Sequence, residues 1–312
     1  METVKLGPLA VSRLGFGTLS LSPLQSTLGA DRGAELLCYA WEKGINFWDT
    51  AQLYDNYPAL ALALKRLPRL PVIATKTYAY TAQGAREAVD EARRALDLDV
   101  LDLVLLHEQT ALTLPGHREA LDWLVNAREK GLIRGVGLST HSVACVEAGA
   151  ACPEIQVIHP LYNLEGIGIH DGGAPQMAAA ISLAKARGKG IYAMKVLGGG
   201  TLFRRAPQAI AHVLSQPWLD SAVIGMSSEA EIDCNVALFT GQALDPETIR
   251  QSLGRHRRLH RADWCVGCGR CVQACGQGAL SLEGGKAQVN EELCVLCGYC
   301  VACCELMCLK IV

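Results

Sequence analysis

Short apolar runs alternate with helical patterns along the first 240 residues of the chain. The runs are four or five residues long and rich in Val, Ile and Leu, which is typical of strands that are buried on both faces of a sheet. They predict strands at residues 14–18, 45–48, 72–75, 103–106, 134–138, 155–158, 190–194 and 221–224. Between them, apolar residues at helical spacing predict helices, the clearest at residues 32–43, 82–96, 117–129, 175–187 and 229–239.

Eight strand–helix units in about 240 residues are the count and size of a (β/α)8 TIM barrel. A doubly wound open sheet is the alternative, but it normally carries a G-x-G-x-x-G loop after its first strand, and no such motif follows residues 14–18. We therefore predict an α/β fold with a TIM barrel at residues 1–242. A helical pattern at residues 245–261 leads us to assign residues 243–260 to a connecting helix and 261–312 to a small second domain.

The second domain is defined by its cysteines, because ten of the 14 Cys in the chain follow residue 264. Two runs with the spacing C-x2-C-x2-C-x3-C are present: Cys265, Cys268, Cys271 and Cys275, and then Cys294, Cys297, Cys300 and Cys304. This spacing resembles that of the bacterial two-cluster ferredoxins. The resemblance implies a small α+β ferredoxin-like domain that holds two [4Fe–4S] clusters.

In the ferredoxins, the fourth Cys of each run ligates the other cluster. The resemblance thus assigns one cluster to Cys265, Cys268, Cys271 and Cys304, and the second to Cys294, Cys297, Cys300 and Cys275. Structural zinc sites are the alternative, although these usually take two close Cys from each of two distant segments. Gly276 and Glu305 stand where ferredoxins usually have Pro, and Cys303 and Cys308 are surplus thiols that compete as ligands.

Polar residues stand where three successive barrel strands are predicted to end, and barrel enzymes carry their chemistry at these ends. Asp49 and Tyr54 lie in NFWDTAQLY after the second strand, Lys76 in VIATKTY after the third, and His107 in LVLLHEQ after the fourth. Any one of them alone is more often structural. Together they predict a catalytic site.

This constellation resembles the catalytic tetrad of the aldo-keto reductases. The likeness covers the whole barrel and includes VKLGPLAVSRLGFGTL, which resembles the opening hairpin of the family, followed by GVGLST, IQVIHPLYN and VIGMSSEAEIDCN. It implies an oxidoreductase that interconverts a small carbonyl substrate and its alcohol. Tyr54 would be the general acid, Lys76 held by Asp49 would lower the pKa of Tyr54, and His107 would hydrogen-bond the substrate oxygen.

The resemblance also implies a nicotinamide cofactor, NADP(H) or NAD(H). Gly17 and Thr18 match the end of the first strand, and Met194 stands where the family stacks an aromatic ring on the nicotinamide. The other contacts implied are Ser139, Thr140 and Gln156 for the carboxamide, followed by Lys195, Leu197, Gly198, Gly225, Ser227, Glu231 and Asn235. Glycines 198–200 would let the backbone approach a pyrophosphate.

The adenine end departs from the NADPH pattern, because Gly225 and Glu231 stand where NADPH-preferring members carry Lys and Arg. A Glu repels a 2′-phosphate, and Glu that accepts from a ribose hydroxyl is the NAD pattern elsewhere. NADH, NADPH and no nicotinamide at all thus remain open.

Charge and composition narrow the expected partners. The net charge of −2 gives no sign of nucleic-acid or membrane binding, and no apolar stretch reaches the length of a membrane span. The opening METVKLGPLA lacks the apolar run of a signal peptide, so we expect a cytoplasmic protein, where cluster thiolates stay reduced. A basic group before the second domain is interpreted as a solvated helix end: Arg250, Arg255, His256, Arg257, Arg258, His260 and Arg261.

Clusters pass single electrons, whereas nicotinamides pass hydride. Three hypotheses follow. In the first, the barrel reduces a carbonyl with a nicotinamide while the clusters serve structure or dock a redox protein partner. In the second, the clusters feed electrons to a substrate in the barrel, with Tyr54 and His107 donating protons. In the third, the chain is an electron carrier with the barrel as scaffold. The tetrad favours the first. The short loop after His107 leaves room for the second domain to cover part of the barrel mouth.

Overall fold

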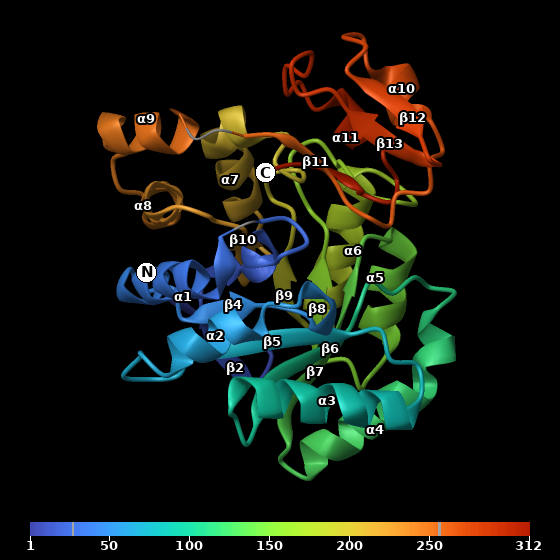
Figure 1. The fold of residues 1–312 in the computed structure, drawn as a ribbon. Helices are drawn as coiled ribbons and strands as arrows, with labels where there is room; N and C mark the ends of the chain where they lie inside the picture. The colour runs from blue at the N-terminus through green and yellow to red at the C-terminus, as the bar shows by residue number, and fades with distance from the viewer. Residues whose placement is uncertain (27, 255–256) are drawn as a thin grey trace.

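The computed structural model describes residues 1–26, 28–254 and 257–312, and it confirms the predicted TIM barrel (Figure 1). Within these residues, eight parallel strands close into a barrel in the order β10-β3-β4-β5-β6-β7-β8-β9. The barrel strands are β3 (Leu14–Gly17), β4 (Phe47–Asp49), β5 (Val72–Thr77), β6 (Leu101–Leu106), β7 (Ile133–Thr140), β8 (Val157–Pro160), β9 (Gly190–Ala193) and β10 (Ser221–Ile224).

An antiparallel hairpin, β1 (Thr3–Leu6) and β2 (Leu9–Ser12), closes the amino-terminal end of the barrel. Its side chains pack with the residues that fill the barrel interior, among them Phe47, Val157 and Tyr192. At Gly190 an added Cβ would lie 2.5 Å from the backbone nitrogen of Gly7, so the hairpin contacts the first residue of β9 directly. The barrel is thus plugged at this end, and its opposite end forms the mouth.

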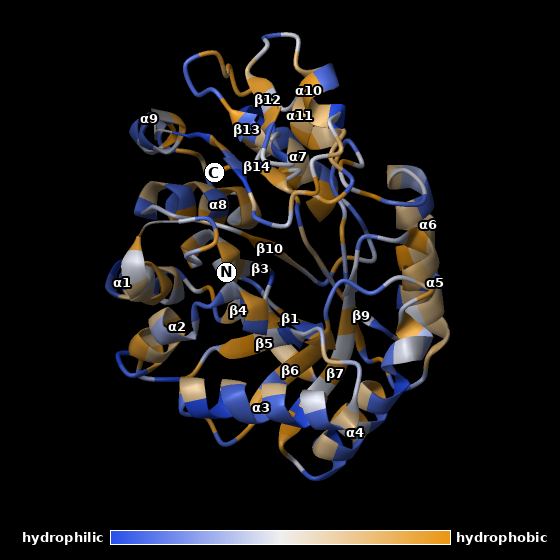
Figure 2. Ribbon diagram, turned by 45° about the vertical axis from the view of Figure 1, so that its right-hand side comes forward, coloured by the Kyte–Doolittle hydropathy of each residue, from blue (hydrophilic) through white to orange (hydrophobic). Residues whose placement is uncertain are grey.

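Helices surround the strands (Figure 2). They are α1 (Gly29–Glu42), α2 (Tyr57–Leu64), α3 (Ala82–Leu96), α4 (Arg118–Glu129), α5 (Val143–Ala151), α6 (Ala174–Ala186), α7 (Ala206–Leu214) and α8 (Glu229–Thr240). Hydrophilic and hydrophobic residues alternate along α3, whereas α5 and α6 are hydrophobic over most of their length (Figure 2). The sequence pattern did not locate α2, α5 and α7. The segments YPALALAL and VACVEAGAA explain why, because they have almost no polar face to create a helical period.

The second domain consists of short elements that lie over the barrel mouth, at the top of Figure 1. Its elements are β11 (Leu259–Arg261), α10 (Arg270–Ala274), β12 (Leu280–Glu283), β13 (Lys286–Val289), α11 (Tyr299–Ala302) and β14 (Leu309–Ile311), and β12 pairs with β13. The helix predicted at residues 245–261 is shorter, α9 (Pro246–Gly254), because Leu259–Arg261 forms an antiparallel strand with β14. Arg255 and His256 of the predicted basic group lie outside the described residues.

The last strand fixes the small domain to the barrel. The backbone N–H of Ile311 in β14 donates to the carbonyl of Gly199, in the loop after β9, at 3.0 Å. Gly200 has a φ of +88°, and a Cβ there would lie 2.0 Å from the carbonyl oxygen of Ile311, so any larger residue would separate the two domains. None of the helices in the described ranges has the length and apolar content to cross a membrane.

Candidate active site and cluster ligands

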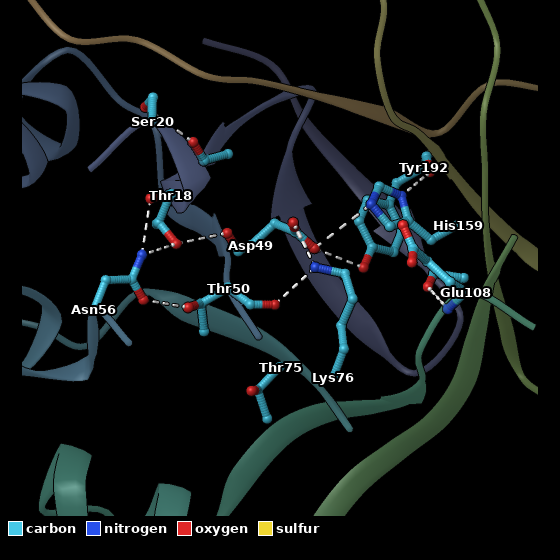
Figure 3. Close-up of polar contacts among 12 residues, drawn as sticks. Thr18, Ser20, Asp49, Thr50, Asn56, Thr75, Lys76, Glu108, His159 and Tyr192 are labelled. Atoms are coloured by element: carbon cyan, nitrogen blue, oxygen red, sulfur yellow. Dashed lines mark hydrogen bonds and ion pairs between the residues drawn. The ribbon is translucent and has the colours of Figure 1, made fainter. Parts of the chain in front are cut away.

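A buried ion pair between Asp49 and Lys76 lies at the centre of the barrel mouth (Figure 3). Asp49 ends β4, and the Nζ atom of Lys76 on β5 donates to its Oδ2 at 2.7 Å and to the carbonyl of Thr50 at 2.7 Å. The hydroxyl of Tyr192 on β9 donates to Oδ1 of Asp49 at 2.9 Å. A buried pair needs such additional bonds to offset the loss of water, and together they hold the ammonium in one position.

Tyr54 lies beside this pair. It ends the short 3-10 turn η2 (Gln52–Tyr54), and its carbonyl accepts a hydrogen bond from the Ser22 hydroxyl at 2.5 Å. Nζ of Lys76 lies 5.0 Å from the centre of the Tyr54 ring. The short turn after β4 therefore brings the phenol back over the strand end, next to the ammonium.

The protonation of Tyr54 differs from the expectation. Burial raises the pKa of Tyr54 well above its usual range, and the charges of Asp49 and Glu108 add to this. The Lys76 charge, which is paired with Asp49 at 2.7 Å, does not bring this pKa below its usual value as the resemblance implied. The phenol is protonated at neutral pH, which is the form that a proton donor requires.

His107 follows β6 directly, and its ring is stacked by Tyr78 with the ring centres 4.4 Å apart. Burial lowers the pKa of His107 to about 3, and the charge of Lys76 adds to this effect. Within the described residues, its Nδ1 atom has no hydrogen-bond partner. The imidazole is therefore neutral, so it suits hydrogen bonding to a substrate oxygen and not the proton donation that the second hypothesis gave it.

Sequence reasoning missed His159 as a site residue. Its ring, at the carboxyl end of β8, stacks on Tyr192 at 3.8 Å, and its Nε2 lies 3.7 Å from Oδ1 of Asp49. Burial lowers the pKa of His159 to about 4, although Asp49 opposes this. A signal was present, because His159 stands at a strand end in IQVIHPLYN, the position that identified His107.

One cavity of about 840 Å³ joins the barrel mouth to the small domain. The predicted tetrad lines one end of it, and Trp264, Leu306 and Lys310 of the small domain line another wall. The expectation that the second domain covers part of the mouth is thereby confirmed.

The nicotinamide residues divide into two groups. Those that line the cavity are Gly17, Met194, Lys195, Leu197, Gly225, Ser227 and Glu231. Those that are not part of its lining are Thr18, Ser139, Thr140, Gln156, Gly198 and Asn235. The Ser139 hydroxyl accepts from the backbone N–H of Glu108 at 2.8 Å, and the Thr140 hydroxyl donates to the carbonyl of Gln109 at 2.7 Å. These two hydroxyls hold the loop after β6 and do not face the mouth.

Gln156 lies at the opposite end of the barrel. It precedes β8, and its side-chain oxygen accepts from the backbone N–H of Val136 at 3.2 Å. The strand predicted at residues 155–158 begins two residues later, at Val157, which shifts the carboxyl end of the strand to His159 and Pro160. The structure therefore does not bring Gln156 to the site.

The adenine end of the predicted cofactor path is filled by contacts within the chain. Glu231 accepts from the backbone N–H of Ser227 at 2.8 Å and pairs with Arg257 at 2.9 Å, and both members of this pair are largely buried. Arg257 also lies over the Phe203 ring, 4.6 Å from its centre. The glycines expected to admit a pyrophosphate instead admit Ile311 of β14. These positions thus hold the small domain on the barrel.

The thiols of the second domain gather in two groups. Cys275, Cys294, Cys297 and Cys300 line one small cavity, although Cys275 belongs to the first run. Burial raises the pKa of Cys300 to about 12, and the thiols of Cys294, Cys297 and Cys275 add to this. Their spacing in the sequence fits a [4Fe–4S] cluster, although within the described residues no group of three or more His, Cys, Asp or Glu side chains is placed to hold a single metal ion.

The other group also combines thiols of both runs, here with Cys304 of the second run beside thiols of the first. Burial raises the pKa of Cys271, with contributions from Cys303, Cys304 and Cys265. Backbone N–H groups donate to the sulfur of Cys265 at 3.5 Å and to that of Cys304 at 3.3 Å, contacts of the kind that hold ligating thiolates. The surplus thiols of Cys303 and Cys308 lie at this group.

The neutral buried histidines predict a loss of stability in acid. In the unfolded chain a histidine takes up a proton near pH 6.5, whereas His107 and His159 stay neutral down to about 3 and 4. The unfolded state binds more protons between these values, so stability falls as the pH falls through 6.5. Between pH 7 and pH 5 we expect a loss of roughly 2 kcal/mol for each of the two histidines.

Anaerobic urea unfolding at the two pH values measures this loss. His159→Asn should remove part of the pH dependence, because the buried neutral rings of His107 and His141 remain, and the matched change His117→Asn on the protein surface should leave it intact. Equal stability of the wild type at pH 7 and pH 5 would contradict the neutral state of the two rings.

Comparison with known proteins identifies the class of protein that this fold and site define. The model of the aldo/keto reductase family matches residues 13–208, and the model of the 4Fe-4S binding domain matches residues 260–281. The chain belongs to the aldo-keto reductase family, an oxidoreductase family, and carries a C-terminal iron–sulfur domain. The second match covers the first cysteine run.

Individual relatives and solved structures are similar to this chain. The soybean (Glycine max) protein named "Probable aldo-keto reductase 1" is 28% identical over 220 residues, which are 64% of this chain and 60% of the relative. A solved structure from Pseudomonas aeruginosa, described as an aldo-keto reductase, is 28% identical, covers 77% of this chain and 95% of its own, and has a TM-score of 0.66. An aldo-keto reductase from Klebsiella pneumoniae, solved in complex with NADPH, is 20% identical, covers 80% of this chain and 93% of its own, and has a TM-score of 0.62.

Proposed function

We propose that the protein reduces a small carbonyl substrate, or oxidises the corresponding alcohol, in the cavity at the barrel mouth. The observation that carries the proposal is that Tyr54, His107 and the Lys76–Asp49 pair line one cavity. Tyr54 gives its phenolic proton to the carbonyl oxygen, and the ammonium of Lys76, 5.0 Å from the ring, stabilises the phenolate that remains. Neutral His107 positions the oxygen by a hydrogen bond.

The C-terminal domain holds two [4Fe–4S] clusters in this proposal. Cys265, Cys268, Cys271 and Cys304 ligate the first cluster, and Cys294, Cys297, Cys300 and Cys275 ligate the second. The gathering of Cys275 with the second-run thiols around one cavity supports the crossed assignment. Bound clusters supply low-potential, single-electron transfer.

The residues present do not fit a nicotinamide held as the family resemblance implied. The hydroxyls of Ser139 and Thr140 bind the loop after β6, Gln156 lies at the other end of the barrel, and Glu231 pairs with Arg257. A nicotinamide held at these residues is therefore not the source of the two electrons, and carbonyl reduction requires another electron donor.

A second candidate function follows, in which the clusters supply the electrons for carbonyl reduction. Reduction of a carbonyl to an alcohol takes up two electrons and two protons: two reduced clusters would supply one electron each, Tyr54 the proton that goes to oxygen, and solvent water in the cavity the proton that goes to carbon. The specific support is that Trp264, which adjoins Cys265 in the chain, lines the same cavity as Tyr54. The small domain thus contributes a wall to the site as well as clusters.

Anaerobic turnover with different electron donors tests these alternatives. The reconstituted protein is incubated with small aldehydes and ketones and with NADH, NADPH or reduced methyl viologen, while alcohol formation and cluster absorbance are followed. We expect reduced methyl viologen to support product formation. NADH and NADPH should each give less than about a tenth of that rate, because the site does not hold a nicotinamide for hydride transfer. Product formation with NADPH while the clusters stay oxidised would instead establish hydride transfer and remove the second candidate.

A further inference from the structure

We propose that the cavity binds a carboxylate group of its substrate between Lys195 and Lys310, so that the substrate is a short oxo- or hydroxycarboxylate. This inference rests on the proposed carbonyl chemistry at Tyr54 and adds the substrate class. It arises from the wall of the cavity that lies between the loop after β9 and the C-terminal strand β14, away from the Asp49–Lys76 pair.

Lys195 reaches this wall through an uncommon backbone conformation. It follows β9 with a φ of +56°, in the left-handed region that side chains other than glycine seldom adopt. The turn is closed by a hydrogen bond from the N–H of Gly198 to the carbonyl of Lys195 at 2.7 Å. A long, charged side chain held in this way at the rim of a cavity is a feature typical of functional sites.

Lys310 reaches the same cavity from the small domain. It lies on β14, its side chain is buried, and its Nζ atom lies 5.0 Å from the centre of the Trp264 ring. Within the part of the chain that the structure describes, neither Lys195 nor Lys310 forms an ion pair with a carboxylate. Burial lowers the pKa of both ammonium groups, and the charge of Lys195 adds to the effect on Lys310.

Few acidic groups act on these two lysines. Glu108 and the thiol of Cys304 act on both of them, and the Glu108 carboxylate already accepts from the Tyr78 hydroxyl at 2.5 Å. Burial lowers the pKa of His141 far below its usual value, so that ring is neutral. Two lysines and a neutral imidazole thus line one wall of the cavity, an arrangement that suits an anionic ligand.

His141 supplies the second, independent observation. Its side chain is only 6% exposed, it lines the cavity, and its Nε2 atom has no hydrogen-bond partner in the described ranges. The nearest carboxylate oxygen, on Glu108, is 3.9 Å from this nitrogen. A buried ring nitrogen without a partner is costly unless a ligand satisfies it, and a carboxylate oxygen would do so.

The anion subsite adjoins the carbonyl site. Glu108 follows His107 directly, and Tyr78 both stacks on the His107 ring and binds Glu108. A substrate whose carbonyl oxygen meets His107 and Tyr54 would therefore place a carboxylate near the lysines only if the two groups are a few bonds apart.

Binding of a matched pair of probes to the cluster-reconstituted protein tests the proposal without turnover. Isothermal titration calorimetry with sodium 2-oxobutyrate and with butanone compares a charged and an uncharged ketone of the same chain length. We expect 2-oxobutyrate to bind at least about tenfold more tightly than butanone, with Lys310→Met and Lys195→Met each removing most of this preference. The matched control Lys130→Met, at an exposed lysine after α4, should keep it.

Three results would overturn the proposal. They are equal affinity for the two probes, a preference that survives in both lysine variants, and competition by inorganic phosphate that acetate does not match. A fourth measurement distinguishes substrate binding by Lys310 from a purely electrostatic effect on the clusters. If Lys310→Met shifts the cluster reduction potential while 2-oxobutyrate binding is unchanged, the lysine serves the clusters only. Because binding is measured directly and without turnover, these outcomes can be interpreted even if the proposed carbonyl chemistry is wrong.

Discussion

Replacement of Tyr54 by Phe is expected to lower kcat for carbonyl reduction by about 10²–10⁴-fold, the usual contribution of a positioned general acid. The ring keeps its place beside Lys76 and His107, so substrate binding and KM should change little. What is lost is the proton for the carbonyl oxygen, which His107 cannot replace because burial lowers its pKa to about 3. Initial rates with the donor that supports turnover measure the effect.

Tyr80→Phe provides the matched control, because it also removes one phenolic hydroxyl but at a side chain that is 65% exposed. That variant should retain the rate of the wild type. Iron content and circular dichroism of Tyr54→Phe should also match the wild type, which separates loss of the proton donor from loss of structure. A Tyr54→Phe enzyme that reduces carbonyls at nearly full rate would remove Tyr54 from the mechanism.

The raised pKa of Tyr54 also predicts how the rate of reduction depends on pH. Burial and the charges of Asp49 and Glu108 keep the phenol protonated through neutral and mildly alkaline pH. Reduction should therefore not decline in that range through loss of the Tyr54 proton. Alcohol oxidation, which needs the phenolate as a base, should be the weaker direction at neutral pH.

Local sequence pattern was sufficient for the barrel and for the tetrad. Parallel strands buried on both faces produce apolar runs, and the polar residues that end such runs come together at the mouth because parallel strands share one carboxyl end. Asp49, Lys76 and His107 were found by this rule, and His159 follows the same rule. Its strand was predicted two residues too early, which hid its position at the end of β8.

Contacts between segments that are distant in the sequence could not be predicted from local sequence pattern. Glycines 198–200 read as a path for a pyrophosphate, yet Gly199 and Gly200 accommodate Ile311, more than a hundred residues later in the chain. Glu231 read as a ribose contact, yet it binds Arg257 from the segment before the small domain. Nothing near Lys310 in the sequence indicates that it enters the barrel cavity. A local pattern carries no information about which remote surface will cover it.

Removal of one cysteine from each of the two runs is expected to distinguish crossed from uncrossed cluster ligation. The wild type should contain roughly eight irons and eight sulfides per chain, the content of two [4Fe–4S] clusters. Cys275→Ala and Cys300→Ala should each reduce this to roughly four, because each removes a ligand from a single cluster. Cys303→Ala, at a surplus thiol, is the matched control and should retain both clusters.

The double variants decide the assignment. If Cys275 and Cys300 ligate the same cluster, as their shared cavity indicates, Cys275→Ala/Cys300→Ala should still hold roughly four irons, whereas Cys271→Ala/Cys275→Ala should lose both clusters. Uncrossed ligation reverses these two results, since Cys271 and Cys275 would then share a cluster. Metal analysis that found zinc in place of iron and sulfide would contradict both arrangements. The crossed pattern would also make the two runs interdependent, so that the clusters join the halves of a domain that is too small to hold itself together by its apolar core alone.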